Sequence, residues 1–230
     1  MNESPPAIRP PPFQLRADSW KLEADLIKPL VFVAALAPVL WLLFRTLTDR
    51  LSANPIEDVT LTTGIWALRF LLISLAITPI RRLTGWHRVI QYRRMLGLFA
   101  FFYATLHLLT YLVLDQGLAF AYILPDIVKR PYITAGMVAF LSMVPLAITS
   151  TKGWIRRLGR RWQMLHRLVY VSSMAACLHF VWKVKVAIGE PVYYAAILGT
   201  LLLFRILWRV RAQYLSARRS LGASAPQSGL

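Results

Sequence analysis

Residues 95–114 read MLGLFAFFYATLHLLTYLVL, a run of 20 positions without Asp, Glu, Lys or Arg. An α-helix rises about 1.5 Å per residue, so a helix of this length spans the hydrocarbon core of a bilayer, which is about 30 Å thick. Lipid offers no partner to a free backbone amide, and the run lacks the apolar/polar alternation of a barrel strand. The stretch therefore predicts a transmembrane helix that carries His107.

Five further stretches share this apolar character, although Arg69 interrupts the second span and Arg167 the fifth. They cover residues 29–44, 59–78, 132–151, 162–182 and 191–204, the last of which is extended by residues 206–208. Hydrophobic residues make up 57% of the 230-residue chain and its mean hydropathy is +0.52, too apolar for an ordinary soluble domain. The sequence predicts an all-α, polytopic membrane protein with six transmembrane helices.

The charges are distributed unequally between the two sides of these spans. The two ends of the chain and the second and fourth loops hold 19 Lys and Arg residues, whereas the first, third and fifth loops hold 6. This positive-inside bias places both termini in the cytoplasm. It also accounts for the net charge of +17 without a nucleic-acid partner, because no soluble basic domain remains to bind one.

The two ends of the chain differ in composition from the apolar middle. Residues 1–26 begin with MNESPPAIRPPPFQLR, which is proline-rich and has no apolar core of a signal peptide, and residues 211–230 are polar toward their end. We expect a disordered cytoplasmic arm over 1–26, a transmembrane domain over 27–210 and a disordered cytoplasmic tail over 211–230. Cys177 is the only cysteine, so no intrachain disulfide exists, and it is interpreted as a small apolar helix residue.

Three histidines lie inside the apolar spans, where ionisable residues are costly and usually functional. His107 lies 13 residues beyond Arg94 and His179 lies 18 residues beyond Arg161, roughly 20 Å and 27 Å along two helices that run in the same direction. The two side chains can therefore face each other near the outer half of the membrane. Such a pair predicts the axial ligands of a heme b, and the absence of CxxCH excludes covalent attachment. The alternative is a pair of buried, hydrogen-bonding histidines.

His166 lies near the cytoplasmic end of the fifth span, 13 residues before His179. In a straight helix this spacing rotates the two side chains by roughly 220°, so they do not share a face. At the matching level the third span offers Arg94 in place of a histidine. Heme ligation by His166 and an ordinary buried histidine both remain open. His87 lies in a basic loop and is interpreted as solvated or interfacial.

Several stretches in the same order resemble the ferric reductase-like transmembrane family, and more closely the MsrQ (YedZ) family of heme-binding membrane subunits. In chain order they are ANPIEDVTLTTGIWALRFLLISLAITPIRR, RRMLGLFAFFYATLHLLTY, KRPYITAGMVAFLSMVPLAITSTKGW, LGRRWQMLHRLVY and CLHFVWKVK. The resemblance runs from about residue 27 to about residue 210. It implies that His107, His166 and His179 are the family's three histidines. Related NADPH oxidases carry two histidines on each of the two helices, so one heme b is expected and a second has an incomplete ligand set.

The resemblance also implies an electron-transfer role in the bacterial inner membrane. Electrons would come from a cytoplasmic flavin reductase or a membrane quinol and leave to a periplasmic, molybdopterin-containing methionine sulfoxide reductase subunit, which repairs oxidised envelope proteins. No catalytic triad is recognisable, so no catalytic residue is assigned and the sulfoxide chemistry is expected in the partner. Two rival functions are a stand-alone ferric or cupric metalloreductase and a non-redox transporter; no inverted repeat typical of transporters is found.

Three arginines are candidate cofactor-binding residues. The family is described as binding FMN, and Arg93 and Arg94 lie where a flavin phosphate could meet guanidinium groups, close in depth to Arg161 and His166. The alternative is that they set topology and contact lipid phosphates. Arg69 lies about 18 Å deep, near the level of His107, where a heme propionate is a suitable anion. Snorkelling or pairing with backbone carbonyls competes with that interpretation.

Overall fold

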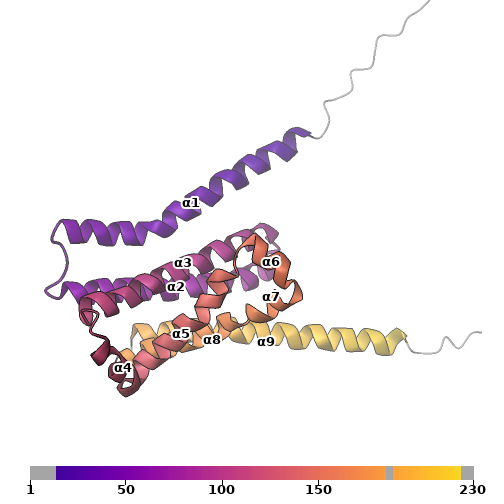
Figure 1. Ribbon diagram of the computed structural model, residues 1–230. Coiled ribbons are helices and arrows are strands. Elements are labelled where there is room, and N and C mark those ends of the chain that lie inside the picture. Colours follow the sequence, from indigo (N-terminus) through magenta and orange to yellow (C-terminus); the bar gives the residue numbers. More distant parts are fainter. Residues whose placement is uncertain (1–13, 185–188, 224–230) are drawn as a thin grey trace, which may run out of the picture.

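A computed structural model describes residues 14–184 and 189–223, and every regular element in these ranges is helical. The elements are α1 (Gln14–Leu47), α2 (Pro55–Thr84), η1 (His87–Gln91), α3 (Tyr92–Leu109), η2 (Thr110–Asp115), α4 (Phe120–Lys129), α5 (Pro131–Ile148), α6 (Lys152–Leu158), α7 (Arg160–Leu165), α8 (Leu168–Lys183) and α9 (Glu190–Ala223). Their arrangement is drawn in Figure 1.

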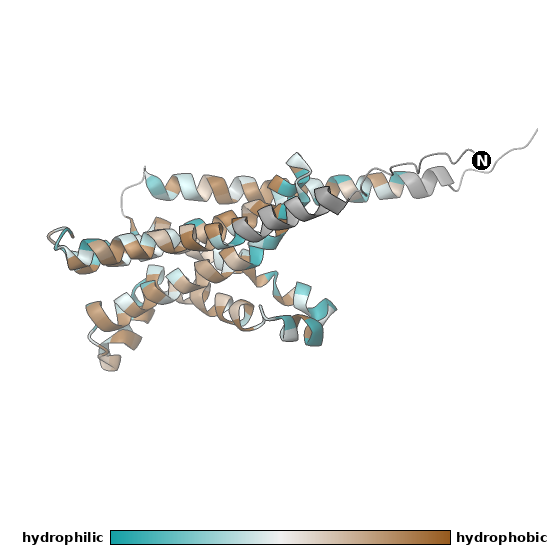
Figure 2. Cartoon of the chain, turned by 90° about the horizontal axis from the view of Figure 1, so that it is seen from above, coloured by the Kyte–Doolittle hydropathy of each residue, from teal (hydrophilic) through white to brown (hydrophobic). Residues whose placement is uncertain are grey.

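Six segments of the described chain are long and apolar enough to cross a membrane, as predicted. They are Ile27–Leu47, Pro55–Thr84, His87–Asp115, Pro131–Ile148, Arg160–Lys183 and Glu190–Arg218. Hydrophobic residues line most of the helix lengths in Figure 2, and many large apolar side chains, among them Leu30, Trp41 and Val138, are exposed. Exposed apolar surface of this extent is what a lipid-facing protein presents. The prediction of an all-α, six-span membrane protein is confirmed.

The outer helices are longer than the sequence indicated. Residues 14–26 of the expected disordered arm form the start of α1, and residues 211–223 of the expected tail continue α9. No Gly or Pro occurs between Gln14 and Lys28, or between Arg205 and Leu221, so each helix can propagate beyond its apolar span. The remainder of both predicted segments, residues 1–13 and 224–230, lies outside the described residues.

Two antiparallel helix pairs form the centre of the bundle. In Figure 1, α2 lies along α3, and α5 lies with α8; these are the two most closely packed helix pairs. α2 is well delimited: the Asn54 side chain accepts the Glu57 amide at its start, and Gly85 ends it in the left-handed conformation at φ 70°. The start of α1 and the end of α9 lie at the same end of the bundle in Figure 1, as an even number of spans requires.

Two apolar clusters hold these helices together. One joins α2 to α3 around Phe70, Phe99 and Tyr103, and the other joins α2, α8 and α9. Cys177 is buried in the second cluster, which confirms its interpretation as a small apolar packing residue. The Tyr103 hydroxyl donates to the Ala35 carbonyl and accepts the Val39 amide, at 2.9 Å and 3.1 Å. Insertion of a side chain into one helical turn beside Pro38 is a recognised cause of the bend that α1 shows in Figure 1.

Candidate heme-binding site

His107 on α3 and His179 on α8 lie next to each other, with ring centroids 5.8 Å apart and ring planes at 78°. The two residues are far apart in the chain, and the packing of α2 with α3 and of α5 with α8 places them at the same depth. Both side chains are half-buried. The structure therefore brings together the two histidines that their spacing from the basic loops had predicted to face each other.

Each imidazole is fixed by a backbone carbonyl of the neighbouring helix. Nδ1 of His107 lies 2.9 Å from the Thr60 carbonyl oxygen, and Nδ1 of His179 lies 2.6 Å from that of Tyr132. A carbonyl oxygen can only accept, so Nδ1 carries the hydrogen in both rings. Neither Nε2 atom has a hydrogen-bond partner within 14–184 and 189–223. The free lone pair of each ring is therefore on Nε2, which is the atom available to a metal.

These residues fit an axial pair for heme. With metal–nitrogen bonds of about 2 Å, the centroids of two imidazoles on opposite sides of one metal lie about 6 Å apart, close to the observed separation. Among the described residues, no group of three or more His, Cys, Asp or Glu side chains is arranged to hold a metal ion. A bare metal site is therefore not supported, whereas a porphyrin brings four nitrogens of its own and needs only two from the protein.

Polar residues at the same end of the bundle connect the supports of the two histidines. The Tyr111 hydroxyl in η2, one turn beyond His107, donates to Asp126 at 2.9 Å, and Asp126 pairs with Arg130 at 2.8 Å. Arg130 also donates to the Tyr132 hydroxyl at 3.1 Å, and this hydrogen bond and the carboxylate raise the pKa of Arg130. The network thus joins the segment after His107 to the residue that holds His179. η2 itself is a π-helix, a form frequent beside functional sites.

Arg69 is bound by neutral groups. Its Nε donates to the Tyr194 hydroxyl at 2.7 Å, and its guanidinium carbon lies 4.8 Å from the centre of the Trp66 ring. No carboxylate pairs with it in the described part of the chain. A tyrosine of α9, and not a backbone carbonyl, therefore accepts the hydrogen bond from Arg69. The other N–H groups of the guanidinium can still bind an anion.

The predicted span over residues 162–182 corresponds to the candidate span Arg160–Lys183, in which a turn at His166 and Arg167 joins α7 to α8. The His166 ring stacks on Trp162 with 3.8 Å between centroids, and its Nδ1 hydrogen-bonds to the Trp162 carbonyl at 3.1 Å. No ring contact joins it to another histidine among the described residues. The structure therefore separates His166 from the His107 and His179 pair.

The first turn of α3 contains both predicted phosphate-binding arginines. Arg94 is exposed, whereas Arg93 is half-buried and is repelled by Arg205 and Arg81. Arg205 is buried; it donates to the Tyr170 hydroxyl and the Leu75 carbonyl, and its Nε has no partner.

Sequence reasoning missed the burial of Arg205, because the residue was assigned to the basic end of the sixth span. The apolar residues 206–208 that continue past it were the available signal.

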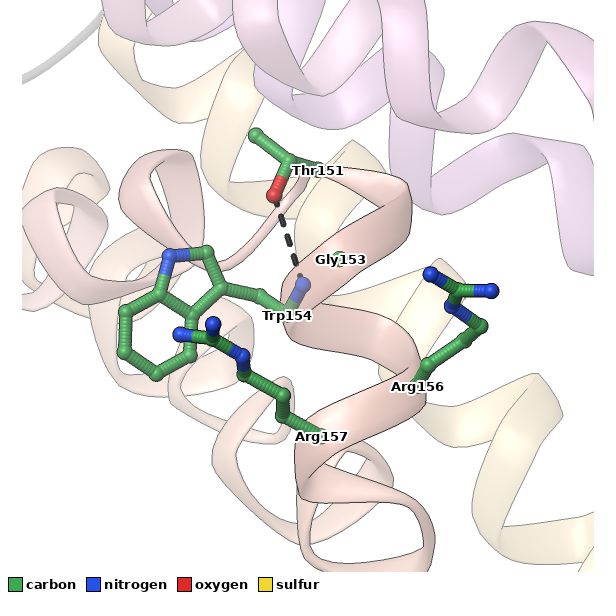
Figure 3. A pocket seen from close by; sticks show the side chains of 5 residues that line it. All are labelled: Thr151, Gly153, Trp154, Arg156 and Arg157. Carbon is green, nitrogen blue, oxygen red and sulfur yellow. Dashed lines mark hydrogen bonds between the residues drawn. The ribbon is translucent and has the colours of Figure 1, made fainter.

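Two surface hollows are not lined by the histidine pair. One, of about 450 Å³, is formed by α6 and the residue before it; Figure 3 shows Thr151 accepting the Trp154 amide there, beside Arg156 and Arg157. The other, of about 350 Å³, is an apolar groove between α5 and α8, lined by Ala135 and Leu178 among others. Neither contains any of the predicted cofactor-binding residues.

Comparison with known proteins places the chain in a family. The family described as ferric reductase like transmembrane component matches residues 63–177. The protein-methionine-sulfoxide reductase heme-binding subunit MsrQ of Xanthomonas axonopodis pv. citri is 51% identical over 199 residues, covering 84% of this chain and 91% of that protein. This chain belongs to the MsrQ family. The MsrQ of Herminiimonas arsenicoxydans is 52% identical over 81% of this chain and 87% of its own length. No solved structure matches the chain.

Membership of the MsrQ family confirms the resemblance identified in the sequence. The matched ferric reductase segment includes His107 and His166 and ends just before His179. His179 nevertheless lies beside His107, because α8 places its ring against the His107 ring.

Proposed function

We propose that this protein is the heme b-binding membrane subunit of a methionine sulfoxide reductase system and carries electrons across the bacterial inner membrane. The observation that carries the proposal is the His107 and His179 pair, with both Nδ1 atoms bound to carbonyls and both Nε2 atoms free. The names of the MsrQ relatives, which describe a heme-binding subunit, support it.

Each residue of the site then has a defined task. His107 and His179 would hold the heme iron, while the carbonyls of Thr60 and Tyr132 hold the two rings in the correct tautomer. Heme b supplies a one-electron carrier at this depth. Arg69 neutralises a heme propionate through the N–H groups that Tyr194 leaves free. The protein needs no acid or base for electron passage.

Electrons enter at the cytoplasmic face, from a flavin reductase or a membrane quinol. Arg93 and Arg94 begin the helix that leads to His107, and no described carboxylate pairs with either. They bind the phosphate of FMN, carried by the donor or by this chain. His166 is the candidate ligand of a second heme near the cytoplasmic face. That heme would need a second axial ligand that is not a histidine in contact with His166. A heme-to-chain ratio near one or near two distinguishes these cases.

Electrons leave toward a periplasmic, molybdopterin-containing methionine sulfoxide reductase. The purified protein is reduced under anaerobic conditions and mixed with that reductase and a methionine sulfoxide substrate, and its absorbance is followed. We expect complete re-oxidation that requires both additions. Re-oxidation by a ferric chelate alone, with none by the reductase and sulfoxide, would instead establish a metalloreductase.

A further inference from the structure

The two histidines make equivalent contacts at the same spacing along the chain. The Thr60 carbonyl lies 47 residues before His107, and the Tyr132 carbonyl also lies 47 residues before His179. One helical turn after each carbonyl stands a glycine, Gly64 in the first case and Gly136 in the second. The pairs α2 with α3 and α5 with α8 therefore present the same carbonyl, glycine and histidine arrangement twice.

Each glycine is in contact with its histidine ring. A Cβ atom on Gly64 would lie 2.9 Å from Nδ1 and 3.0 Å from Cε1 of His107. On Gly136 it would lie 2.8 Å and 3.1 Å from the same atoms of His179. Carbon atoms do not approach a ring this closely without displacing it, and the ring cannot move away without lengthening its Nδ1 hydrogen bond.

The backbone does not require glycine at these positions. Both residues lie inside long helices, and neither has the positive φ that Gly85 shows. Glycine in a helix interior costs roughly 0.5–1 kcal/mol relative to alanine. Gly97 in α3 and Gly199 in α9 also lie inside membrane-spanning helices, but a Cβ there would meet nothing within 4 Å. Close contact with the imidazole is therefore the property that separates Gly64 and Gly136 from these other glycines.

We propose that Gly64 and Gly136 are positioning residues that let each axial histidine lie against the neighbouring helix, where the carbonyl one turn away fixes its tautomer and raises its basicity. The inference rests on the proposed function, because the histidines matter in this way only as heme ligands. A strong Nδ1 hydrogen bond makes Nε2 a better donor to ferric iron, and displacement of the ring weakens that bond. Because the arrangement is duplicated, the two sides of the site contribute equivalent supports.

The test replaces each glycine by alanine in the full-length protein, purified in detergent and confirmed as monodisperse. Gly64→Ala and Gly136→Ala are each expected to lower heme affinity by about 10- to 100-fold, the range found for residues that orient metal ligands. Any heme retained should have a higher midpoint potential, because a weaker donor stabilises ferric iron less. Gly97→Ala and Gly199→Ala should keep the heme content and midpoint potential of the wild-type protein.

Three results separate the claims. Wild-type protein without heme would refute the proposed function itself. Wild-type heme content and potential in both Gly64→Ala and Gly136→Ala would overturn the positioning role while leaving the proposed function intact. Aggregation of both variants, with Gly97→Ala and Gly199→Ala well folded, would also overturn it, since the glycines would then serve helix packing instead of ligand placement.

Discussion

Replacing His107 or His179 by alanine is expected to lower specific heme binding by about 100-fold or more, beyond the loss produced by changes to orienting residues. Each ring supplies one of two axial nitrogens, and no third histidine among the described residues contacts the pair. Removing one ring also leaves its carbonyl partner, Thr60 or Tyr132, without that hydrogen bond. The measurement is heme per folded chain after purification, by extraction and absorbance.

His87→Ala is the matched control, because His87 lies in η1, outside the histidine pair. It should keep the full heme content. Added imidazole should partly restore the heme spectrum of His107→Ala and His179→Ala by occupying the space of the lost ring. Retention of wild-type heme content in both alanine variants would show that these residues are not the ligands.

The second large effect concerns Arg69, which we place beside a heme propionate. A cation about 10 Å from the iron, at an effective dielectric constant near 20, stabilises the added electron by about 1–2 kcal/mol, equal to roughly 40–90 mV. Arg69→Gln removes this charge and should lower the midpoint potential by that amount. A redox titration followed by absorbance measures the shift.

Two further variants separate charge from packing. Arg69→Lys keeps the cation and should keep most of the wild-type potential, although it loses the planar contact with Trp66. Tyr194→Phe removes the 2.7 Å hydrogen bond to Arg69 without changing charge and should shift the potential less than Arg69→Gln. Equal potentials in Arg69→Gln and the wild-type protein would place Arg69 away from the heme.

The histidine pair shows how far sequence reasoning reached. The depths of His107 and His179 followed from residue counts and the positive-inside bias, because helical rise is regular and the basic loops mark where each span begins. The carbonyls of Thr60 and Tyr132 could not be foreseen in the same way, since backbone atoms carry no sequence signal. Gly64 and Gly136 were visible as letters, but only the packing of neighbouring helices shows what they contact.

Other features depended on local structure that periodicity does not encode. The turn at His166 and Arg167 lies inside the candidate span Arg160–Lys183, and the hydropathy that predicted this span does not reveal the turn. Arg205 was counted as a cytoplasmic charge, yet Tyr170 and Leu75 satisfy two of its nitrogens within the bundle. The extensions of α1 and α9 beyond the apolar spans depend on helix propagation, which composition alone indicates only weakly.

The electron paramagnetic resonance spectrum of the oxidised protein tests the central claim most directly. When the planes of two axial imidazoles lie near the observed 78°, the two iron d orbitals that overlap with the imidazole π systems are nearly equal in energy. This near-equality gives a strongly anisotropic low-spin ferric signal. The account predicts that signal in the wild-type protein and its loss in His107→Ala and His179→Ala. A high-spin signal alone, or no heme signal in the wild-type protein, would contradict it.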